Sequence, residues 1–203
     1  MTPGAMCLCS RGLVHSRTME AVLDILPEPW WLIMSHDLPI PEAQNYVTRE
    51  ALARGAKWIW YVEEDVVPQP GFISSALDHA SSGFDVIAAD YPLATQPGVV
   101  RMGKNGPVYA GMGCLLVRAT VFDRITKPWF EAAQWSYDKA NDRWTRVHHG
   151  AGRIYGGQDI HFFAQLHGAG IPFKVLPGKC QHLRVKEYGA EGTNDGCHKI
   201  EAI

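Results

Sequence analysis

Residues 57–68 read KWIWYVEEDVVP, and no other part of the sequence says as much about the protein. Residues 58–62 form a short run of aromatic and β-branched residues, which predicts a buried strand. Glu63, Glu64 and Asp65 follow at once, and we expect them at the strand tip because a buried, unpaired carboxylate is costly. Three adjacent carboxylates repel one another unless a cation lies between them, and a divalent metal with oxygen ligands is the obvious candidate.

Strand geometry separates the three acids. Side chains alternate along a strand, so Glu63 and Asp65 should point to one side and Glu64 to the other. In an open α/β sheet, ligands bind outside the carboxyl ends of the strands, where these acids are expected. The alternative is a solvated strand end whose acids cap the next element, and residues 57–68 alone favour neither interpretation.

The composition is that of an ordinary globular protein. The 203 residues are enough for one domain, which we expect to span residues 1–203, and 46% of them are apolar and 20% charged. The formal net charge of −2 gives no electrostatic reason to expect nucleic acid or an anionic membrane as a partner. No apolar stretch approaches the length of a membrane span. The five cysteines are odd in number and show no disulfide pattern, so we expect a reducing, cytoplasmic setting.

The hydrophobic pattern predicts an α/β fold. Strands are expected at residues 5–10, 30–34, 58–62, 84–89, 108–117 and 173–176, and helices at 16–26, 41–54, 72–81, 120–125 and 159–167. The strand–helix–strand–helix–strand order of the first half implies parallel strands joined by right-handed crossovers. We therefore expect a mostly parallel central sheet flanked by helices, with an irregular stretch at 127–157 and a polar tail from about residue 184.

Two further places hold residues that can do chemistry. A pair of glycines precedes Gln158, Asp159 and an apolar helix. An acid there stabilises a helix N-terminus, which alone explains Asp159, but beyond a flexible hinge the same carboxylate can also act as a general base toward a hydroxyl. His182 follows the last predicted strand, and it becomes a candidate ligand for Mn²⁺ or Mg²⁺ only if it meets Asp65 in space.

Together these stretches resemble the GT-A-fold glycosyltransferases, particularly the family 2-like enzymes. In the first half, residues 7–12 look like the first nucleotide-binding strand, and residues 43–49 look like the A-R-N helix with Gln44 in place of the arginine. Residues 63–65 look like the D-x-D motif with Glu63 in the first acidic place. The order of these motifs along the chain is that of the family.

The second half continues the resemblance. Residues 111–117, followed by Phe122 and residues 128–130, are similar to the G-x-G-C-x-L-I…F…P-W-F stretch of the family. Residues 157–162 look like the G-E-D-x-x-F motif, and residues 170–182 look like the strand that leads to the terminal histidine. The resemblance therefore covers most of the chain.

The resemblance implies a GT-A (Rossmann-like) fold, a UDP- or GDP-linked sugar as donor, and Mn²⁺ or Mg²⁺ as cofactor. By that analogy the metal ligands are Asp65, His182 and Glu63, and Asp159 deprotonates the acceptor hydroxyl, which gives inversion. The residues that the resemblance assigns to the nucleotide sugar are Ser10, Arg11, Asn45, Arg49, Glu64, Gly111 and Gly113. Those assigned to the sugar or acceptor are Asp90, Trp129 and Gln158. Charge alone, and not the resemblance, suggests that Arg184 or Lys186 in the tail helps to hold the diphosphate.

The sequence leaves two other functions open. A nucleotidyltransferase also uses an acidic strand tip, a metal and a nucleotide, but it usually has a basic, Gly-rich loop, of which Arg11 and Gly12 are a thin version. A non-catalytic protein that binds nucleotide sugars or carbohydrates is permitted because Gln158 and Glu63 depart from the family pattern. The acceptor is not identified: a glycan, a protein side chain, a small metabolite and a modified nucleic-acid base all remain open, and the weak acidity argues mildly against nucleic acid.

Overall fold

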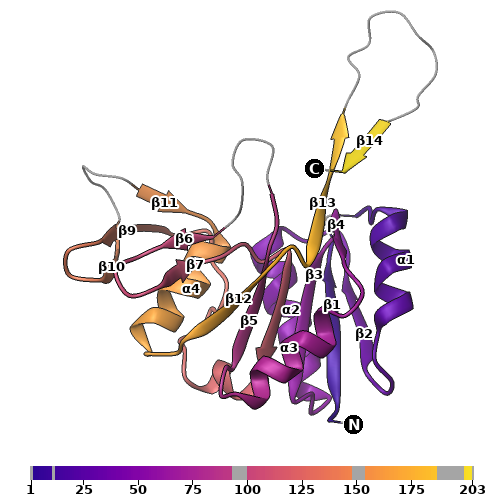
Figure 1. The fold of residues 1–203 in the computed structure, drawn as a ribbon, viewed down its shortest axis with the longest axis horizontal. Helices are drawn as coiled ribbons and strands as arrows, with labels where there is room; N and C mark the ends of the chain where they lie inside the picture. The colour runs from indigo at the N-terminus through magenta and orange to yellow at the C-terminus, as the bar shows by residue number, and fades with distance from the viewer. Residues whose placement is uncertain (1, 11, 93–99, 148–153, 187–198, 203) are drawn as a thin grey trace, which may run out of the picture.

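The structure, a computed structural model, describes residues 2–10, 12–92, 100–147, 154–186 and 199–202, with backbone alone for 154, 184–186 and 199–202. Its centre is a six-stranded sheet with the strand order β12-β5-β8-β3-β1-β2 (Figure 1). Its strands are β1 (Gly4–Cys9), β2 (Trp31–Ser35), β3 (Trp58–Glu63), β5 (Val86–Asp90), β8 (Cys114–Arg118) and β12 (Phe173–Pro177). Within this sheet β8 alone is antiparallel to its neighbours, so the predicted α/β class with a mostly parallel sheet is confirmed.

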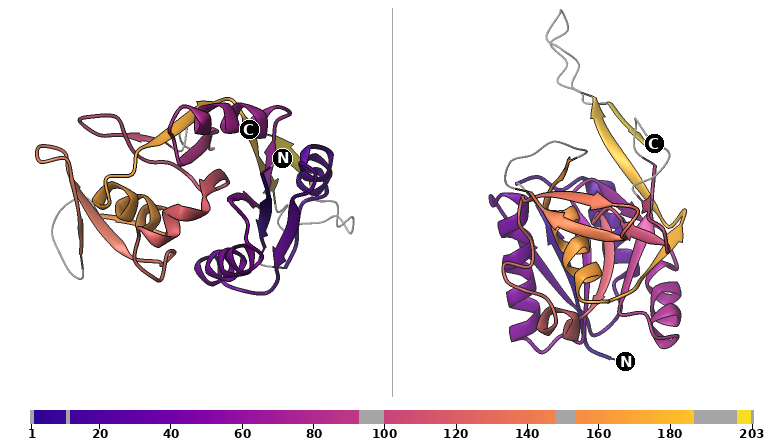
Figure 2. Two further views of the ribbon diagram at one scale, coloured as in Figure 1. Left: turned by 90° about the horizontal axis from the view of Figure 1, so that it is seen from below. Right: turned by 90° about the vertical axis from the view of Figure 1, so that its left-hand side faces the viewer.

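Helices cover both faces of the central sheet (Figure 2). One face carries α2 (Ile40–Ala53), α4 (Gln158–Gly168) and the short 3-10 helix η1 (Ala119–Asp123), and the other carries α1 (Ser16–Ile25) and α3 (Phe72–Ser81). Along β1, Cys7 and Cys9 lie in the core on the α2 face, while Met6 and Leu8 lie in the core on the α1 face. Because both faces are covered, the strands are apolar on both sides, which explains the unbroken apolar run of β3.

Local signals set the ends of the first two helices. α1 begins after His15, whose Nδ1 accepts a hydrogen bond from the backbone N–H of Arg17 at 3.1 Å. α2 has Pro41 in its first turn and is followed by Gly55, whose φ of +77° suits glycine. These two helices make the crossovers that place β2 and β3 on either side of β1.

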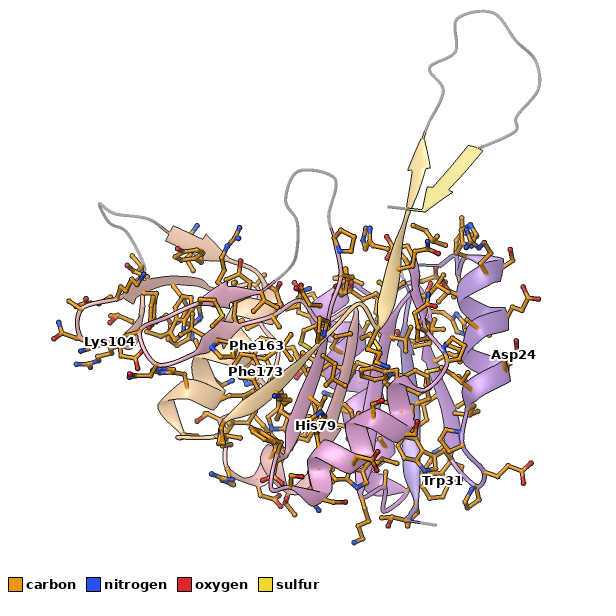
Figure 3. The ribbon with its side chains drawn as sticks, viewed as in Figure 1. Asp24, Trp31, His79, Lys104, Phe163 and Phe173 are labelled. Carbon is orange, nitrogen blue, oxygen red and sulfur yellow. The ribbon has the colours of Figure 1, made fainter. Side chains whose placement is uncertain are left out.

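The last helix is anchored to the edge strand of the sheet. Phe163 of α4 contacts Phe173 of β12, with ring centroids 4.6 Å apart (Figure 3). Phe162, in the same core cluster, stacks on Phe130 with ring centroids 5.1 Å apart. The apolar helix predicted from the sequence is therefore held on the sheet, with Asp159 in its first turn.

Three smaller sheets complete the described chain, and two of them correct the sequence analysis. Their strands are β4 (Val66–Pro68), β6 (Arg101–Met102), β7 (Pro107–Tyr109), β9 (Gln134–Asp138), β10 (Arg143–Arg146), β11 (Ile154–Gly156), β13 (Cys180–Lys186) and β14 (Lys199–Ala202). The stretch 127–157, expected to be irregular, contains the antiparallel sheet β10-β9-β11, and the expected polar tail continues as β13 paired with β14 and β4. Short strands of mixed polarity carry little periodic signal, so the pattern missed them.

The strand expected over residues 108–117 is also divided in the structure. β7 ends at Tyr109 and pairs with β6, whereas β8 begins at Cys114 in the central sheet. The segment between them holds Gly111 and Gly113, and glycine disfavours a strand interior because it has no side chain to pack. None of the described helices has the length and apolarity needed to cross a membrane.

Candidate functional site

The acids singled out in the sequence lie at the carboxyl edge of the central sheet. β3 ends at Glu63 and β5 ends at Asp90, and both strands are antiparallel to β8, so they end at the same edge. This is the edge at which α/β sheets bind ligands. Asp90 also lines a pocket of about 1080 Å³ between β12 and the β6–β7 hairpin.

The structure brings Asp65 and His182 together. The chain turns at Glu64 and Asp65 and returns as β4, which pairs with β13 so that His182 lies opposite Val66. The backbone N–H of Leu183 donates to the Asp65 carbonyl oxygen at 2.8 Å, which fixes the two strands beside the turn. His182 Nε2 then lies 3.5 Å from Asp65 Oδ2. His182 therefore meets Asp65 in space, which was the condition for treating it as a candidate metal ligand.

Glu63 does not complete a three-residue metal site. In the part of the chain that the structure describes, no group of three or more His, Cys, Asp and Glu side chains is arranged to hold a metal. Glu63 is the last residue of β3, and the turn that follows ends the strand alternation on which the Glu63–Asp65 pair was predicted. Glu64 instead contributes its carbonyl oxygen, which accepts a hydrogen bond from the His15 N–H at 2.9 Å and ties the turn to the start of α1.

Tyr91 is a member of this site that the sequence analysis missed. Its ring stacks on the His182 ring, with centroids 5.7 Å apart and planes 4° apart, and its Oη accepts a hydrogen bond from the Gly113 N–H at 3.0 Å. Burial raises the pKa of Tyr91 well above its usual value, and the carboxylates of Glu63 and Asp159 raise it further. The one signal in the sequence that could have pointed to Tyr91 is its position directly after the end of β5. A single aromatic residue at a strand end does not indicate that it stacks on a distant histidine.

Asp159 lies in the first turn of α4, after Gly157 in a positive-φ conformation (φ +130°). Its Oδ1 accepts a hydrogen bond from the Ile160 N–H at 2.8 Å, as expected for an acid at a helix start. Burial nevertheless raises the pKa of Asp159. The Asp159 carboxylate also raises the pKa of Tyr91 and of Tyr109, so it lies near both tyrosines. Gln158 is the first residue of the helix and is partly buried.

Aromatic side chains gather beside Asp159, but Trp129 is not among them. Tyr109 lies 6.2 Å from Tyr155 and 6.4 Å from Trp144, measured between ring centroids. Trp129 is only 4% exposed, packs in the main core and donates its Nε1–H to the Phe122 carbonyl oxygen at 3.1 Å. A buried ring with a satisfied N–H is a core residue, so the assignment of Trp129 to a sugar-binding platform is corrected.

Asn45 and Ser10 are occupied in holding the fold. The Asn45 Nδ2 donates to the Pro41 carbonyl oxygen at 2.8 Å and to the Phe130 carbonyl oxygen at 2.7 Å, so it ties α2 to the segment before β9. The fully buried Ser10 donates its hydroxyl hydrogen to the Leu13 carbonyl oxygen at 3.1 Å, and its Oγ accepts from the Gly12 N–H at 3.0 Å. These hydrogen bonds give Asn45 and Ser10 a structural role that does not require a bound nucleotide.

The remaining residues that the sequence predicted for the site lie on α2, before β8 and on β13, or outside the described chain. Arg49 is exposed and lines a pocket of about 450 Å³ beside α2. Gly111 and Gly113 lie in the buried segment before β8, next to Tyr91. Arg11 lies outside the described residues. Arg184 and Lys186 continue β13 beyond His182, and their side chains are likewise outside what the structure describes.

Comparison with known proteins supports the fold. No protein-family model matches this sequence, and no curated protein matches it. Among solved structures, A197 from STIV is 16% identical with a TM-score of 0.64, and the match covers 90% of this chain and 85% of A197. The chain therefore shares the fold of A197.

Two glycosyltransferases are more distant matches. A glycosyltransferase involved in the glycosylation of the major capsid of PBCV-1 is 12% identical with a TM-score of 0.42, over 61% of this chain and 63% of the other. Drosophila β-1,4-galactosyltransferase 7 is 15% identical with a TM-score of 0.45, over 86% of this chain and 65% of the other.

Proposed function

We propose that this protein is a metal-dependent glycosyltransferase, which moves a sugar from a nucleotide-diphosphate sugar to an acceptor hydroxyl with inversion. The observation that carries the proposal is the meeting of Asp65 and His182 at the carboxyl edge of the sheet. The partly buried Asp159 carboxylate lies near Tyr91, which stacks on His182. Sequence segments far apart supply Asp65, Asp159 and His182, in the order of the family motifs that they resemble.

The residues present fit a metal that arrives with its nucleotide. Mg²⁺ and Mn²⁺ are commonly held by one or two protein ligands together with substrate phosphates and water. Asp65 and His182 are such a pair, with His182 Nε2 3.5 Å from Asp65 Oδ2. When bound there, the ion would neutralise negative charge on the leaving diphosphate. Arg184 and Lys186, which follow His182 on β13, are proposed to help hold the diphosphate through their positive charge.

Asp159 is proposed as the general base. Its raised pKa makes the carboxylate a better proton acceptor than an exposed aspartate, because burial disfavours its charged form. In the reaction, the acceptor hydroxyl gives its proton to Asp159 and its oxygen bonds to the anomeric carbon. The bond from that carbon to the diphosphate oxygen breaks, and the nucleoside diphosphate leaves with the electron pair.

Aromatic residues beside the base offer a surface for the acceptor. Tyr109 and Tyr155 are both partly exposed and lie next to the start of α4, where Trp129 was expected. Rings of this kind stack on the apolar faces of sugars. We therefore place the acceptor between these two tyrosines and Asp159.

A product assay distinguishes the proposal from its alternatives. The protein is incubated with Mn²⁺ and a mixed acceptor library, once with UDP- and GDP-sugars and once with nucleoside triphosphates and sugar phosphates. The released nucleotide or pyrophosphate and the acceptor masses are measured. Transfer releases nucleoside diphosphate and adds one sugar mass to an acceptor, whereas a nucleotidyltransferase releases pyrophosphate from a nucleoside triphosphate. Asp159→Asn should abolish transfer while donor binding persists, and Asp78→Asn, at an exposed position of α3, is the matched control. Full activity of Asp159→Asn would show that Asp159 is not the general base.

A further inference from the structure

We propose that Tyr91 is the positioning residue of the Asp65–His182 pair. Its ring holds the His182 imidazole in the orientation in which Nε2 faces Asp65. The inference rests on the proposed function, in which this pair holds the metal. Nothing in the sequence motifs assigns Tyr91 a role. The structure points to it through ring geometry, backbone hydrogen bonds and burial.

The first observation is the stacking of the two rings. Tyr91 follows the last residue of β5, and His182 lies within β13, so different sheets bring them together. Their planes are 4° apart and their centroids 5.7 Å apart, which is an offset, parallel arrangement. A ring that lies parallel to the imidazole and beside it limits rotation of the imidazole about its Cβ–Cγ bond, which is the positioning role assigned to Tyr91.

The second observation is that backbone groups hold Tyr91 independently of His182. The Gly113 N–H donates to Tyr91 Oη at 3.0 Å, and the Gly113 carbonyl oxygen accepts from the Glu63 N–H at 3.1 Å. A Cβ on Gly113 would lie 2.3 Å from Tyr91 Oη, so only glycine permits this approach. Tyr91 is itself 4% exposed. The tyrosine is thus fixed to the tip of β3, the same strand tip that leads to Asp65.

The third observation is what His182 lacks. Histidine ligands of metals usually donate their second ring N–H to a carboxylate or a carbonyl, which fixes the ring. The Nδ1 of His182 is buried and has no such partner among the described residues, and its Nε2 is 3.5 Å from Asp65, longer than an ordinary hydrogen bond. Neither nitrogen is held by a short hydrogen bond within the described chain. The tyrosine ring performs the orienting role that a hydrogen bond usually has.

Two substitutions separate the ring from the hydroxyl. Tyr91→Phe keeps the stacked ring and loses the acceptor of the Gly113 N–H, whereas Tyr91→Leu loses both. If the ring is what positions His182, affinity for Mn²⁺ with UDP or GDP should stay within about twofold for Tyr91→Phe and fall about tenfold or more for Tyr91→Leu, as for other changes behind a metal ligand. Equal losses in the two variants would assign the effect to the hydroxyl bond and overturn the proposal.

A measurement without metal or nucleotide keeps the test independent of the proposed function. The protein is labelled with ¹³C-histidine, the His182 ring signals are assigned by their absence in His182→Gln, and ring relaxation is measured in the metal-free protein. The ring should be rigid in the wild type and in Tyr91→Phe and mobile in Tyr91→Leu. A ring equally rigid in all three would overturn the proposal. If Tyr91→Leu does not fold, Tyr91→Met removes the aromatic face with an unbranched side chain that adapts to irregular core space. Absence of Mn²⁺–nucleotide binding by the wild type would refute the proposed function alone, since relaxation still decides the role of Tyr91.

Discussion

Gly113→Ala should destabilise the protein, because the added methyl group has no space. The new Cβ would lie 2.3 Å from Tyr91 Oη and 2.7 Å from Val66 Cγ2. Both neighbours are buried, with Tyr91 4% and Val66 0% exposed, so neither can swing into solvent. The backbone must shift, and the hydrogen bond from the Gly113 N–H to Tyr91 must lengthen or break.

The expected loss follows from two contributions. Overpacking of a well-packed core costs about 1–3 kcal/mol, and loss of a typical hydrogen bond costs about 1 kcal/mol. The free energy of unfolding should therefore fall by about 2–4 kcal/mol. For a chain of this size about 2–4 °C of Tm corresponds to each kcal/mol, so Tm should fall by roughly 5–15 °C.

Gly168→Ala is the matched control. Gly168 is the last residue of α4, and apart from its chain neighbours and the backbone of its own helix, no described heavy atom lies within 4 Å of a Cβ built there. Alanine at that position should leave stability unchanged or raise it by about 0.4–1 kcal/mol, because it restricts the unfolded chain. Thermal and urea unfolding of the wild type and both variants measure the difference. If Gly113→Ala and Gly168→Ala unfold at the same temperature, the packing around Tyr91 is not as described.

Two further substitutions test Asp159 and Asn45. Burial raises the pKa of Asp159, so the folded state binds the proton more tightly than the unfolded state, and stability falls as the pH rises from the unfolded pKa through the folded pKa. Asp159→Asn should therefore be more stable than the wild type at pH 8 in urea unfolding, with an advantage that shrinks as the pH approaches 4; a variant less stable at pH 8 would contradict this. Asn45→Ala should cost about 1–3 kcal/mol in the same assay, because it leaves the partly buried Phe130 carbonyl oxygen without its side-chain donor from α2. Arg49→Ala, one turn further along α2 at an exposed position, should lower the free energy of unfolding by less than about 0.5 kcal/mol. Equal losses in the two variants would show that the Asn45 hydrogen bonds do not stabilise the fold.

The central sheet could be predicted because its strands obey simple rules. β1, β3 and β5 are buried on both faces, so they appear as unbroken apolar runs that end in polar residues. The helices between them show apolar residues at helical spacing, with proline or glycine near their ends. The fold class followed from these local signals.

The errors arose where tertiary contacts override local pattern. The pairing of Glu63 with Asp65 assumed a continuous strand, but the chain turns after Glu63 and sends Asp65 toward β13. The role given to Trp129 assumed an exposed ring, but the ring packs against Phe122 in the core. Strand periodicity shows where a side chain points only while the strand lasts, and composition does not show which aromatic residues are buried.

The contacts of the site itself depend on long-range pairing. His182 meets Asp65 because β4 and β13 are antiparallel neighbours, although the two residues are far apart in the sequence. Tyr91 stacks on His182 and accepts a hydrogen bond from the Gly113 N–H, and no sequence motif indicates either contact. The sequence could therefore name candidates for the site but could not predict how they are held together.

Calorimetric titration of Mn²⁺ with UDP, and separately with GDP, into the wild type, Asp65→Ala and Asp24→Ala tests the central claim most directly. Asp24 is an exposed acid on α1 and serves as the control for a lost charge. The wild type and Asp24→Ala should bind one of the two nucleotides only when Mn²⁺ is present, and Asp65→Ala should lose that metal-dependent binding. Binding by Asp65→Ala that equals the wild type, or nucleotide binding that is indifferent to Mn²⁺, would contradict a metal-bound diphosphate at the strand tip.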